Sequence, residues 1–267
     1  MSCNRPWICK DKKGNIVTVP CGWCLQCRID KRNEWTLRLS FEVQKSSGCF
    51  ITLTYDDLHL PIDESLNKRD LQLFIKRFRK NLGSIKIKYY AVGEYGEKGN
   101  IITGLQRPHY HLIVTGINAL KAQTYISKSW NKGFIKILPA NPSTIRYTLK
   151  YMDKQLHGES VKKVYGEKLP PFATMSKGIG LDWIFNNIDT INELNGIPFG
   201  GVIRPIPRYY KQKLGIETNQ QYSEDKLRLI KDFMKKYPHV TFVEALNHFG
   251  KINENELEKE INMFNKK

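Results

Sequence analysis

Two histidines separated by one residue, His109 and His111, lie in the apolar stretch P-H-Y-H-L-I-V-T. Alternate residues of a strand point to the same face, so both imidazoles can reach one ion. Two histidines hold a metal weakly, and we expect Glu94 to add a carboxylate, with Glu97 and Gln106 as rivals. Such a set with open positions suits Mg²⁺ or Mn²⁺ acting on a phosphate. Because a histidine pair of this kind also fits two ordinary surface residues, the spacing alone does not decide its role.

A pair of tyrosines lies in Y-T-L-K-Y-M-D-K, at residues 147–154. Tyr147 and Tyr151 are four residues apart, so on a helix both phenols lie on one face and can reach a common point. Lys150 and Lys154 each follow a tyrosine by three residues. A phenol with a pKa of about 10 is a poor nucleophile until a cation stabilises the phenolate. The alternative is that both tyrosines are core aromatics with solvated hydroxyls.

The cysteines form a third group. Cys21, Cys24 and Cys27 follow one another in C-G-W-C-L-Q-C, where a C-x-x-C step lets two thiolates meet one ion across a tight turn. Tetrahedral Zn²⁺ takes four such ligands, and Cys3 or Cys9 could be the fourth, of which we take Cys3 as the candidate. We expect a structural zinc site, the alternative being a set of small buried thiols. All six cysteines lie in the first fifth of the chain: Cys3, Cys9, Cys21, Cys24, Cys27 and Cys49.

Hydrophobic periodicity and turn residues indicate the elements that must position these side chains. Aromatic and β-branched runs predict strands, and apolar stripes with basic opposite faces predict helices. The predicted strands cover residues 49–55, 85–94, 108–115 and 134–138, and the predicted helices cover residues 28–40, 67–82, 119–130 and 143–155. This order predicts an α+β fold with a central antiparallel β-sheet and helices packed behind it.

Composition limits the class of partner. The chain has 43 Lys and Arg against 26 Asp and Glu, a formal net charge of +17, and such a field attracts polyanions, nucleic acid above all. No run of about 18 apolar residues is present to span a bilayer, and the first residues lack the apolar stretch of a secretory signal. We therefore expect no membrane partner and a reducing cytoplasm. Charge alone fits a ribosome-associated or RNA-binding protein equally well.

Taken together, these motifs resemble a known family. The sequence is similar to the replication initiators of microvirus-type single-stranded DNA phages, within the HUH endonuclease superfamily. The matching segments are V-P-C-G-W-C-L-Q-C (19–27), F-I-T-L-T-Y (50–55), G-E-Y-G (93–96), R-P-H-Y-H-L-I-V (107–114), Y-T-L-K-Y-M-D-K (147–154), P-P-F-A-T-M-S-K-G-I-G (170–180) and P-R-Y-Y (207–210). The resemblance ends at about residue 215. One departure is Tyr110, where HUH proteins usually have an aliphatic residue, and we expect it to pack behind the strand.

The resemblance implies a chemistry. A tyrosine attacks the scissile phosphate in a reaction that needs Mg²⁺ or Mn²⁺, leaving a 5′-phosphotyrosine and a free 3′-OH for a polymerase. Tyr147 and Tyr151 would alternate as nucleophiles, and Lys150 and Lys154 would stabilise charge. The implied partner is single-stranded DNA at a phage replication origin. No G-x-x-x-x-G-K-[ST] loop is present, so we expect helicase and replication machinery from the bacterial host, in whose cytoplasm the protein would act.

We expect four regions along the chain. They are a Cys-rich basic segment at 1–48, an HUH nuclease core at 49–156, a basic and aromatic extension at 157–215 and a helical tail at 216–267. In the extension, cations interleave with aromatic residues, which fits either a single-strand groove or an aromatic mini-core under surface lysines. Two other functions stay open: an HUH relaxase or transposase with the same chemistry, and a non-catalytic zinc-bearing nucleic-acid-binding regulator. The regulator would leave the histidine and tyrosine pairs without a role.

Overall fold

The structure is a computed structural model of the chain. It describes residues 3, 5–10, 14, 16–96, 107–216, 224–242, 244–252 and 255. The chain divides into two compact units, a larger one of Arg32–Tyr210 and a smaller one of Met1–Lys31 with Lys211–Lys267. The larger unit contains the central sheet, and the smaller one contains the cysteine cluster and the C-terminal helices.

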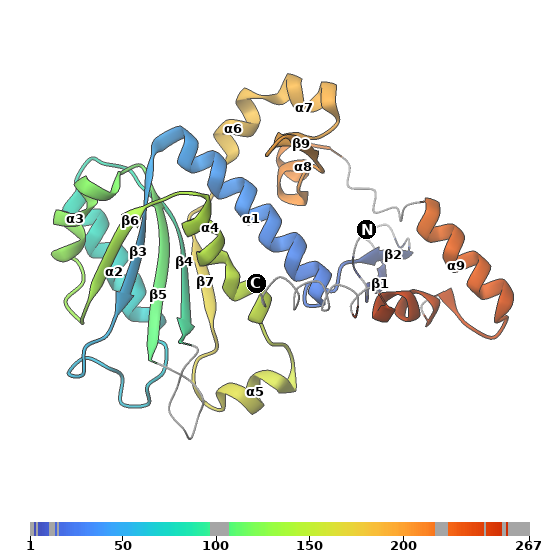
Figure 1. The fold of residues 1–267 in the computed structure, drawn as a ribbon, viewed down its shortest axis with the longest axis horizontal. Helices are drawn as coiled ribbons and strands as arrows, with labels where there is room; N and C mark the ends of the chain where they lie inside the picture. The colour runs from blue at the N-terminus through green and yellow to red at the C-terminus, as the bar shows by residue number, and fades with distance from the viewer. Residues whose placement is uncertain are drawn as a thin grey trace. The chain divides into compact units, whose positions relative to one another are not determined.

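A five-stranded sheet forms the centre of the larger unit, in the order β6-β3-β5-β4-β7 (Figure 1). Its strands are β3 (Gly48–Thr54), β4 (Lys88–Tyr95), β5 (Pro108–Thr115), β6 (Ile135–Pro139) and β7 (Phe172–Met175). Every neighbouring pair is antiparallel. The α+β fold class is therefore confirmed, and β3 to β6 lie within a few residues of the predicted strands.

The fifth strand, β7, does not follow from the sequence pattern. It comes from the extension after residue 156 and pairs with β4, with Phe172 opposite Gly93 and Met175 opposite Tyr90. Its four residues are too few to establish an alternation of polar and apolar positions. A Cβ at Gly93 would stand 3.0 Å from the Phe172 ring, so the absence of a side chain there leaves room for the strand. The extension thus contributes directly to the central sheet.

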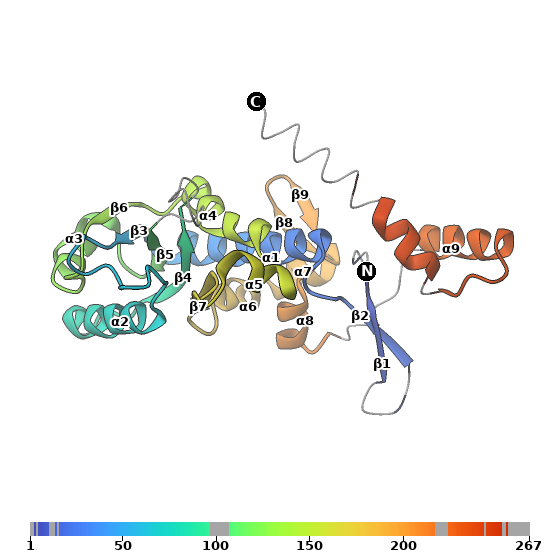
Figure 2. The ribbon, with the colours of Figure 1, turned by 90° about the horizontal axis from the view of Figure 1, so that it is seen from below.

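Helices cover both faces of this sheet, which Figure 2 shows with the strands seen end-on. The first face carries α2 (Lys68–Leu82) and α3 (Ala119–Ser127), and the second carries α1 (Leu25–Ser46) and α4 (Pro142–Leu149). Along β5, Leu112 belongs to the first apolar layer and Ile113 to the second. The sequence-based expectation placed helices only behind the sheet. A strand with apolar residues on both sides requires a second layer, and α1 and α4 supply it.

The helix predicted over residues 143–155 is divided in the structure. α4 begins with a capping box, in which the side chains of Asn141 and Thr144 each bond the other residue's backbone N–H. It ends at Leu149, and η1 (Lys150–Lys154) continues as a tighter 3-10 helix. The prediction of one continuous α-helix is therefore wrong. Because a 3-10 helix rotates further per residue, a four-residue spacing across this junction no longer keeps two side chains on one face.

Aromatic residues of the extension pack inward. The elements between residues 157 and 215 are α5 (Glu159–Tyr165), β7, α6 (Leu181–Asn186), α7 (Ile188–Leu194), β8 (Ile197–Phe199), β9 (Val202–Arg204) and α8 (Arg208–Leu214). Trp183 stacks on Phe41 with 3.7 Å between ring centroids. Tyr210 is fully buried, and the Tyr209 ring lies against the guanidinium of Arg38. Of the two interpretations of this segment, the packing favours the aromatic mini-core.

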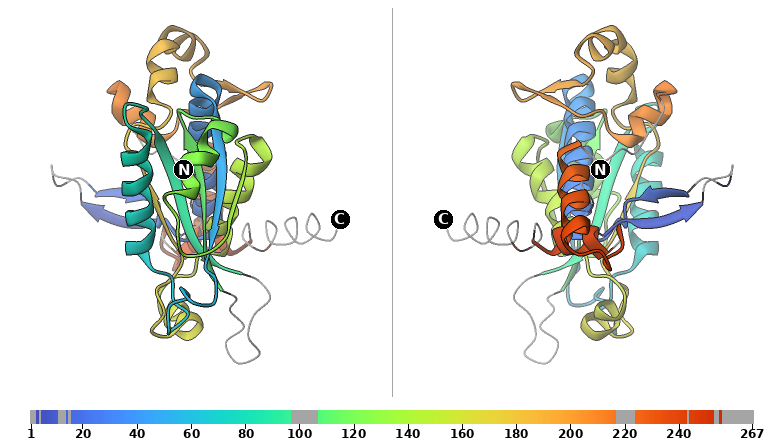
Figure 3. Two further views of the ribbon diagram at one scale, coloured as in Figure 1. Left: turned by 90° about the vertical axis from the view of Figure 1, so that its left-hand side faces the viewer. Right: turned by 90° about the vertical axis from the view of Figure 1, so that its right-hand side faces the viewer.

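The smaller unit contains a hairpin and helices. β1 (Trp7–Lys10) and β2 (Ile16–Val19) pair with each other as a separate antiparallel sheet (Figure 3). In α9 (Glu224–Lys236), Ile230 packs against Ala245 and Leu246, which agrees with the expected helical tail. Among the helices of the described residues, none combines the length and the apolar character needed to cross a bilayer.

Candidate active site

Antiparallel register brings Glu94, His109 and His111 onto one face of the sheet. Glu94 of β4 stands opposite His109 of β5, and His111 follows two residues later on the same side. The Nε2 atoms of His109 and His111 lie 3.5 and 3.2 Å from the same Glu94 oxygen, Oε1. One potential ligand atom from each residue lies within 4.8 Å of the others. The structure thus brings together the three residues that the sequence suggested as ligands.

Both imidazoles are held through their Nδ1 atoms. His109 Nδ1 donates to the Arg107 carbonyl at 3.2 Å, and His111 Nδ1 lies 3.0 Å from the Thr52 hydroxyl. A carbonyl only accepts, so Nδ1 of His109 carries the proton and Nε2 keeps a lone pair when the ring is neutral. Nε2 of His111 is buried and makes no hydrogen bond of normal geometry within the described residues. An unsatisfied ring nitrogen facing a carboxylate fits a bound cation.

The charges of this cluster suit a divalent cation. Burial alone would raise the pKa of Glu94, but the neighbouring His109 and His111 outweigh it and lower that pKa to about 2. Burial lowers the pKa of His111 below its ordinary value, and Glu94 offsets this only in part. At neutral pH the cluster therefore offers a carboxylate and a neutral buried imidazole, which are the forms that coordinate metals.

The residue between the histidines, Tyr110, points to the opposite face of the sheet. It is fully buried, with its hydroxyl 2.8 Å from the Tyr55 hydroxyl, and it donates to the Asn67 carbonyl at 2.9 Å. This confirms that Tyr110 packs behind the strand, and it joins β5 to the N-cap of α2. The rival ligands Glu97 and Gln106 lie outside the described residues.

Tyr147 reaches the cluster from α4. Its ring centroid lies 5.0 Å from that of His111 and 5.9 Å from that of Phe50, at nearly right angles to both rings. Tyr147 is 54% exposed. A phenol that is both beside the cluster and open to solvent can meet a DNA strand without rearrangement of the helix.

Tyr151 is placed differently. It is 5% exposed, and its hydroxyl lies 3.3 Å from the Tyr90 hydroxyl in a layer that also contains Trp35. Burial raises the pKa of Tyr151, and the charge of Glu94 adds to this effect. The expectation that both phenols share one helix face is wrong for this conformation, because the chain passes from α4 into η1 between them.

The two lysines of the tyrosine motif lie at and beyond this junction. Lys150 is exposed where α4 meets η1. The backbone of Lys154 belongs to η1, but its side chain is outside the described part of the chain. Their charge-stabilising role stays a prediction from the sequence.

Two residues that face the cluster are missed by the sequence interpretation. Thr52 of β3 stands opposite His111, and Lys136 of β6 stands opposite Thr52. Lys136, Thr52 and His111 therefore form a row across three neighbouring strands, and Lys136 is exposed. The available signal is the threonine inside F-I-T-L-T-Y. Its partners follow only from the strand register, which the local sequence does not contain.

A second group of potential metal ligands lies in the smaller unit. The Sγ atoms of Cys3, Cys21, Cys24 and Cys27 all lie within 4.8 Å of one another. Cys9 is exposed on β1 and is not part of the group, so Cys3 rather than Cys9 completes it. The structure thus contains two groups that could hold metals, one of sulfur donors and one of nitrogen and oxygen donors.

Comparison with known proteins identifies the family. A family model for replication-associated proteins of the ORF2 type matches residues 48–156, which include the histidines and both tyrosines. The chain is also 30% identical over 254 residues to "Replication-associated protein ORF2" of Spiroplasma virus 4, covering 84% of this chain and 74% of the relative. The chain belongs to the ORF2 family of replication-associated proteins. The resemblance to phage replication proteins seen in the sequence is thereby confirmed.

Further relatives of this ORF2-family protein carry similar descriptions. It is 31% identical over 218 residues to "Replication-associated protein VP4" of Bdellovibrio phage phiMH2K, covering 72% of this chain and 66% of the relative. It is 24% identical over 219 residues to "Replication-associated protein ORF4" of Chlamydia phage 1, covering 73% of this chain and 53% of the relative. The chain therefore spans about half to three quarters of the length of these relatives. No solved structure matches it.

Proposed function

We propose that this protein starts rolling-circle replication by cutting single-stranded DNA at a phage origin and later rejoining the ends. Its family membership supports a role in replication. The site supports the chemistry, because a solvent-exposed phenol stands beside two histidines and a carboxylate. The observation that carries the proposal is the distance of 5.0 Å between the ring centroids of Tyr147 and His111.

In this proposal Glu94, His109 and His111 hold Mg²⁺ or Mn²⁺, which accept oxygen and nitrogen donors and leave positions for a phosphate. Such an ion supplies charge neutralisation on the scissile phosphate. The surrounding residues orient the donors: the Thr52 hydroxyl holds one imidazole and the Arg107 carbonyl holds the other.

Tyr147 is the nucleophile of the first cut. Its phenolic oxygen forms a bond to phosphorus while the bond from phosphorus to the 3′-oxygen breaks, so the 5′-end is held as a phosphotyrosine. The phenol gives up its proton to solvent, and the departing oxygen takes up a proton to become a 3′-OH. The energy of the phosphodiester is kept in the adduct, so the reaction needs no ATP. The exposed Lys150 lies three residues after Tyr147 and would stabilise developing negative charge.

Closing the circle requires a second phenol while the first is still bound to DNA. Tyr151 is the candidate, although in this structure its hydroxyl faces that of Tyr90. A change of η1 to α-helix would move Tyr151 onto the face of Tyr147, because the four-residue spacing then applies. The electrostatic effect of Glu94 on Tyr151 supports a short path between the two positions. In the final step a 3′-OH attacks the phosphotyrosine and releases the tyrosine.

The partner in this reaction is single-stranded DNA carrying the origin, and the formal net charge of +17 favours such a polyanion. The 3′-OH left by the cut would be extended by the replication machinery of the bacterial host, in the host cytoplasm. The host would also supply the helicase that separates the strands.

The proposal is tested by incubating the full chain with single-stranded fragments of its own genome and Mn²⁺. Denaturing electrophoresis should reveal a covalent protein–DNA adduct with origin fragments and none with control fragments of equal length. A substrate carrying two origins should in addition release a closed single-stranded circle, which separates a replication initiator from a relaxase or transposase. Protein that binds these fragments but forms no adduct with either metal would instead be a non-catalytic DNA-binding regulator.

A further inference from the structure

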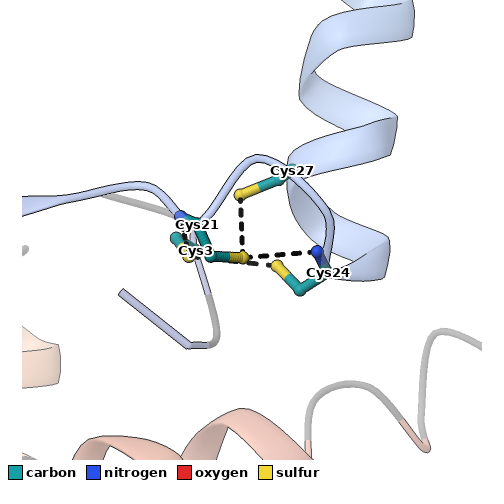
Figure 4. Close-up of side chains that lie close together, drawn as sticks. All are labelled: Cys3, Cys21, Cys24 and Cys27. Carbon is teal, nitrogen blue, oxygen red and sulfur yellow. Dashed lines mark hydrogen bonds between the residues drawn. The ribbon is translucent and has the colours of Figure 1, made fainter. Parts of the chain in front are cut away.

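The four clustered cysteines come from separate places in the chain. Cys3 precedes β1, Cys21 and Cys24 follow β2, and Cys27 lies in the first turn of α1. Figure 4 shows their sulfur atoms turned toward one another. The Sγ atoms of Cys3 and Cys24 are 3.9 Å apart, and those of Cys21 and Cys27 are 4.0 Å apart. All four are free cysteines.

These separations match four sulfur ligands around one ion. With Zn–S bonds of about 2.3 Å, the sulfur atoms of a tetrahedral site lie roughly 3.8 Å apart. Sulfur atoms joined in a disulfide lie about 2 Å apart. The observed 3.9 and 4.0 Å are therefore close to the edges of a tetrathiolate tetrahedron and about twice a disulfide bond.

The backbone around the cluster also directs positive dipoles at the sulfur atoms. The N–H of Cys21 donates to Cys3 Sγ, and the N–H of Cys24 donates to Cys21 Sγ, each at 3.3 Å. Gly22 has a φ of +83°, which allows the tight turn between Cys21 and Cys24. Cys24 and Cys27 lie at the N-terminus of α1, where the helix dipole favours thiolates over thiols.

Little else stabilises this segment. Every residue of β1 is exposed. In the described part of residues 1–24, the buried side chains are Cys3, Pro6 and Cys24. The core that joins this segment to the start of α1 consists of the four cysteines themselves. A hairpin of this size buries too little apolar surface to be stable alone, and small segments of this kind usually depend on a metal or on disulfides.

We propose that Cys3, Cys21, Cys24 and Cys27 bind one structural Zn²⁺, which closes the base of the β1–β2 hairpin and joins it to the start of α1. Four thiolates in a tetrahedron are a donor set of structural zinc sites, and they leave no position open for a substrate. The ion is distinct from the Mg²⁺ or Mn²⁺ of the proposed nuclease reaction, because its ligands are sulfur atoms of the smaller unit.

Elemental analysis of the full chain, purified with a reductant and without chelator, should find about one zinc per chain. Cys24→Ser should lower the zinc content by at least about tenfold after dialysis against a weak chelator, because a ligand is lost. Cys9→Ser is the matched control, since this thiol lies on the same hairpin outside the cluster, and its zinc content should equal that of wild type. His109→Ala should also keep its zinc, which distinguishes this ion from a metal on the central sheet.

Wild-type protein decides the matter even where Cys24→Ser does not fold. Growth with cobalt in place of zinc should give the visible absorption bands of a tetrahedral cobalt tetrathiolate. Zinc-free protein whose four thiols are all alkylated would overturn the proposal in favour of buried thiols. Two disulfides found by mass spectrometry without reductant, or iron in place of zinc, would overturn it as well.

Discussion

The phenol ring of Tyr147 stands 5.0 Å from the imidazole of His111, centroid to centroid, and at 77° to it. One ring belongs to α4 and the other to β5, so this contact joins the helix to the strand that carries both histidines. Tyr151, four residues later, meets Tyr90 instead. The two tyrosines therefore have unequal access to the cluster, and we expect them to respond differently to substitution.

Tyr147→Phe should reduce formation of the DNA adduct on the order of a hundredfold or more, because the nucleophilic oxygen is lost while the ring remains. Tyr151→Phe should change the first cut by less than about threefold, because a phenol buried against Tyr90 takes no part in it. It should nevertheless impair release of closed circles. Denaturing electrophoresis gives the adduct yield, and peptide mapping identifies the modified tyrosine. Adducts of equal yield on both tyrosines of the wild type would mean that the phenols are equivalent, as their spacing in the sequence predicted.

His109→Ala and His111→Ala should each abolish DNA cutting while DNA affinity changes by less than about twofold. Binding depends on many phosphate contacts, whereas each histidine is one of three expected ligands. His59→Ala is the matched control, because His59 is exposed and its Nδ1 lies 2.7 Å from Asp56 rather than near the cluster. Fluorescence anisotropy measures the affinity, and gel assays measure the cut. Wild-type rates in either variant at saturating metal would exclude the metal-site assignment.

Tyr110→Phe tests the reverse face of the same strand. The lost hydroxyl bonds Tyr55 and both backbone groups of Asn67, so we expect unfolding to become easier by about 1–2 kcal/mol. Burial raises the pKa of Tyr110 to about 12. A raised pKa stabilises the fold fully below the ordinary value of about 10, and this contribution is lost as the pH rises from about 10 to 12.

Over that alkaline window the Tyr110→Phe variant should therefore lose less stability than the wild type. Urea denaturation at a series of pH values measures the difference. Because Tyr110 faces away from the histidines, DNA cutting at neutral pH should persist. An identical alkaline loss in both proteins would assign the effect to other buried phenols such as Tyr55, whose pKa burial also raises.

Local pattern was sufficient for the metal-ligand cluster. The apolar run of β5 lies between Pro108 and Gly116, and the predicted strand coincides with the observed one. β4 and β5 are neighbours in sequence as well as in the sheet, so a carboxylate at the end of one strand falls beside a histidine at the start of the next. Glu94 and His109 therefore follow from the sequence, because the contact depends on a single hairpin.

Tyr151 could not be placed from the sequence, because its position depends on distant contacts. Tyr151 and Met152 pack in the same layer as Trp35 and Leu39 of α1, more than a hundred residues earlier in the chain. Helical periodicity contains no information on such partners, so it extended α4 through residues that form η1. β7 depends in the same way on a pairing with β4 that its four residues do not announce.

Thr52 holds the imidazole of His111 from the neighbouring strand, with 3.0 Å between its hydroxyl and Nδ1. Thr52→Val keeps the shape of the side chain and removes this partner, so the ring can rotate and its Nε2 is no longer fixed. We expect the Mn²⁺ concentration for half-maximal cutting to rise about tenfold or more, with most of the rate restored at saturating metal. Thr52→Ser keeps the hydroxyl and should remain near wild type. Metal titrations of the cutting rate measure both variants.

The matched control for Thr52→Val is Thr54→Val, two residues along the same face of β3. Thr54 stands opposite His109, but its hydroxyl bonds the Phe134 carbonyl at 3.4 Å rather than an imidazole. A general loosening of β3 would affect both valine variants and would lower their melting temperatures together. A role in orienting His111 changes the metal dependence of Thr52→Val alone. Equal shifts in metal dependence for the two variants would therefore contradict the role of Thr52, whereas rescue by serine but not by valine would support it.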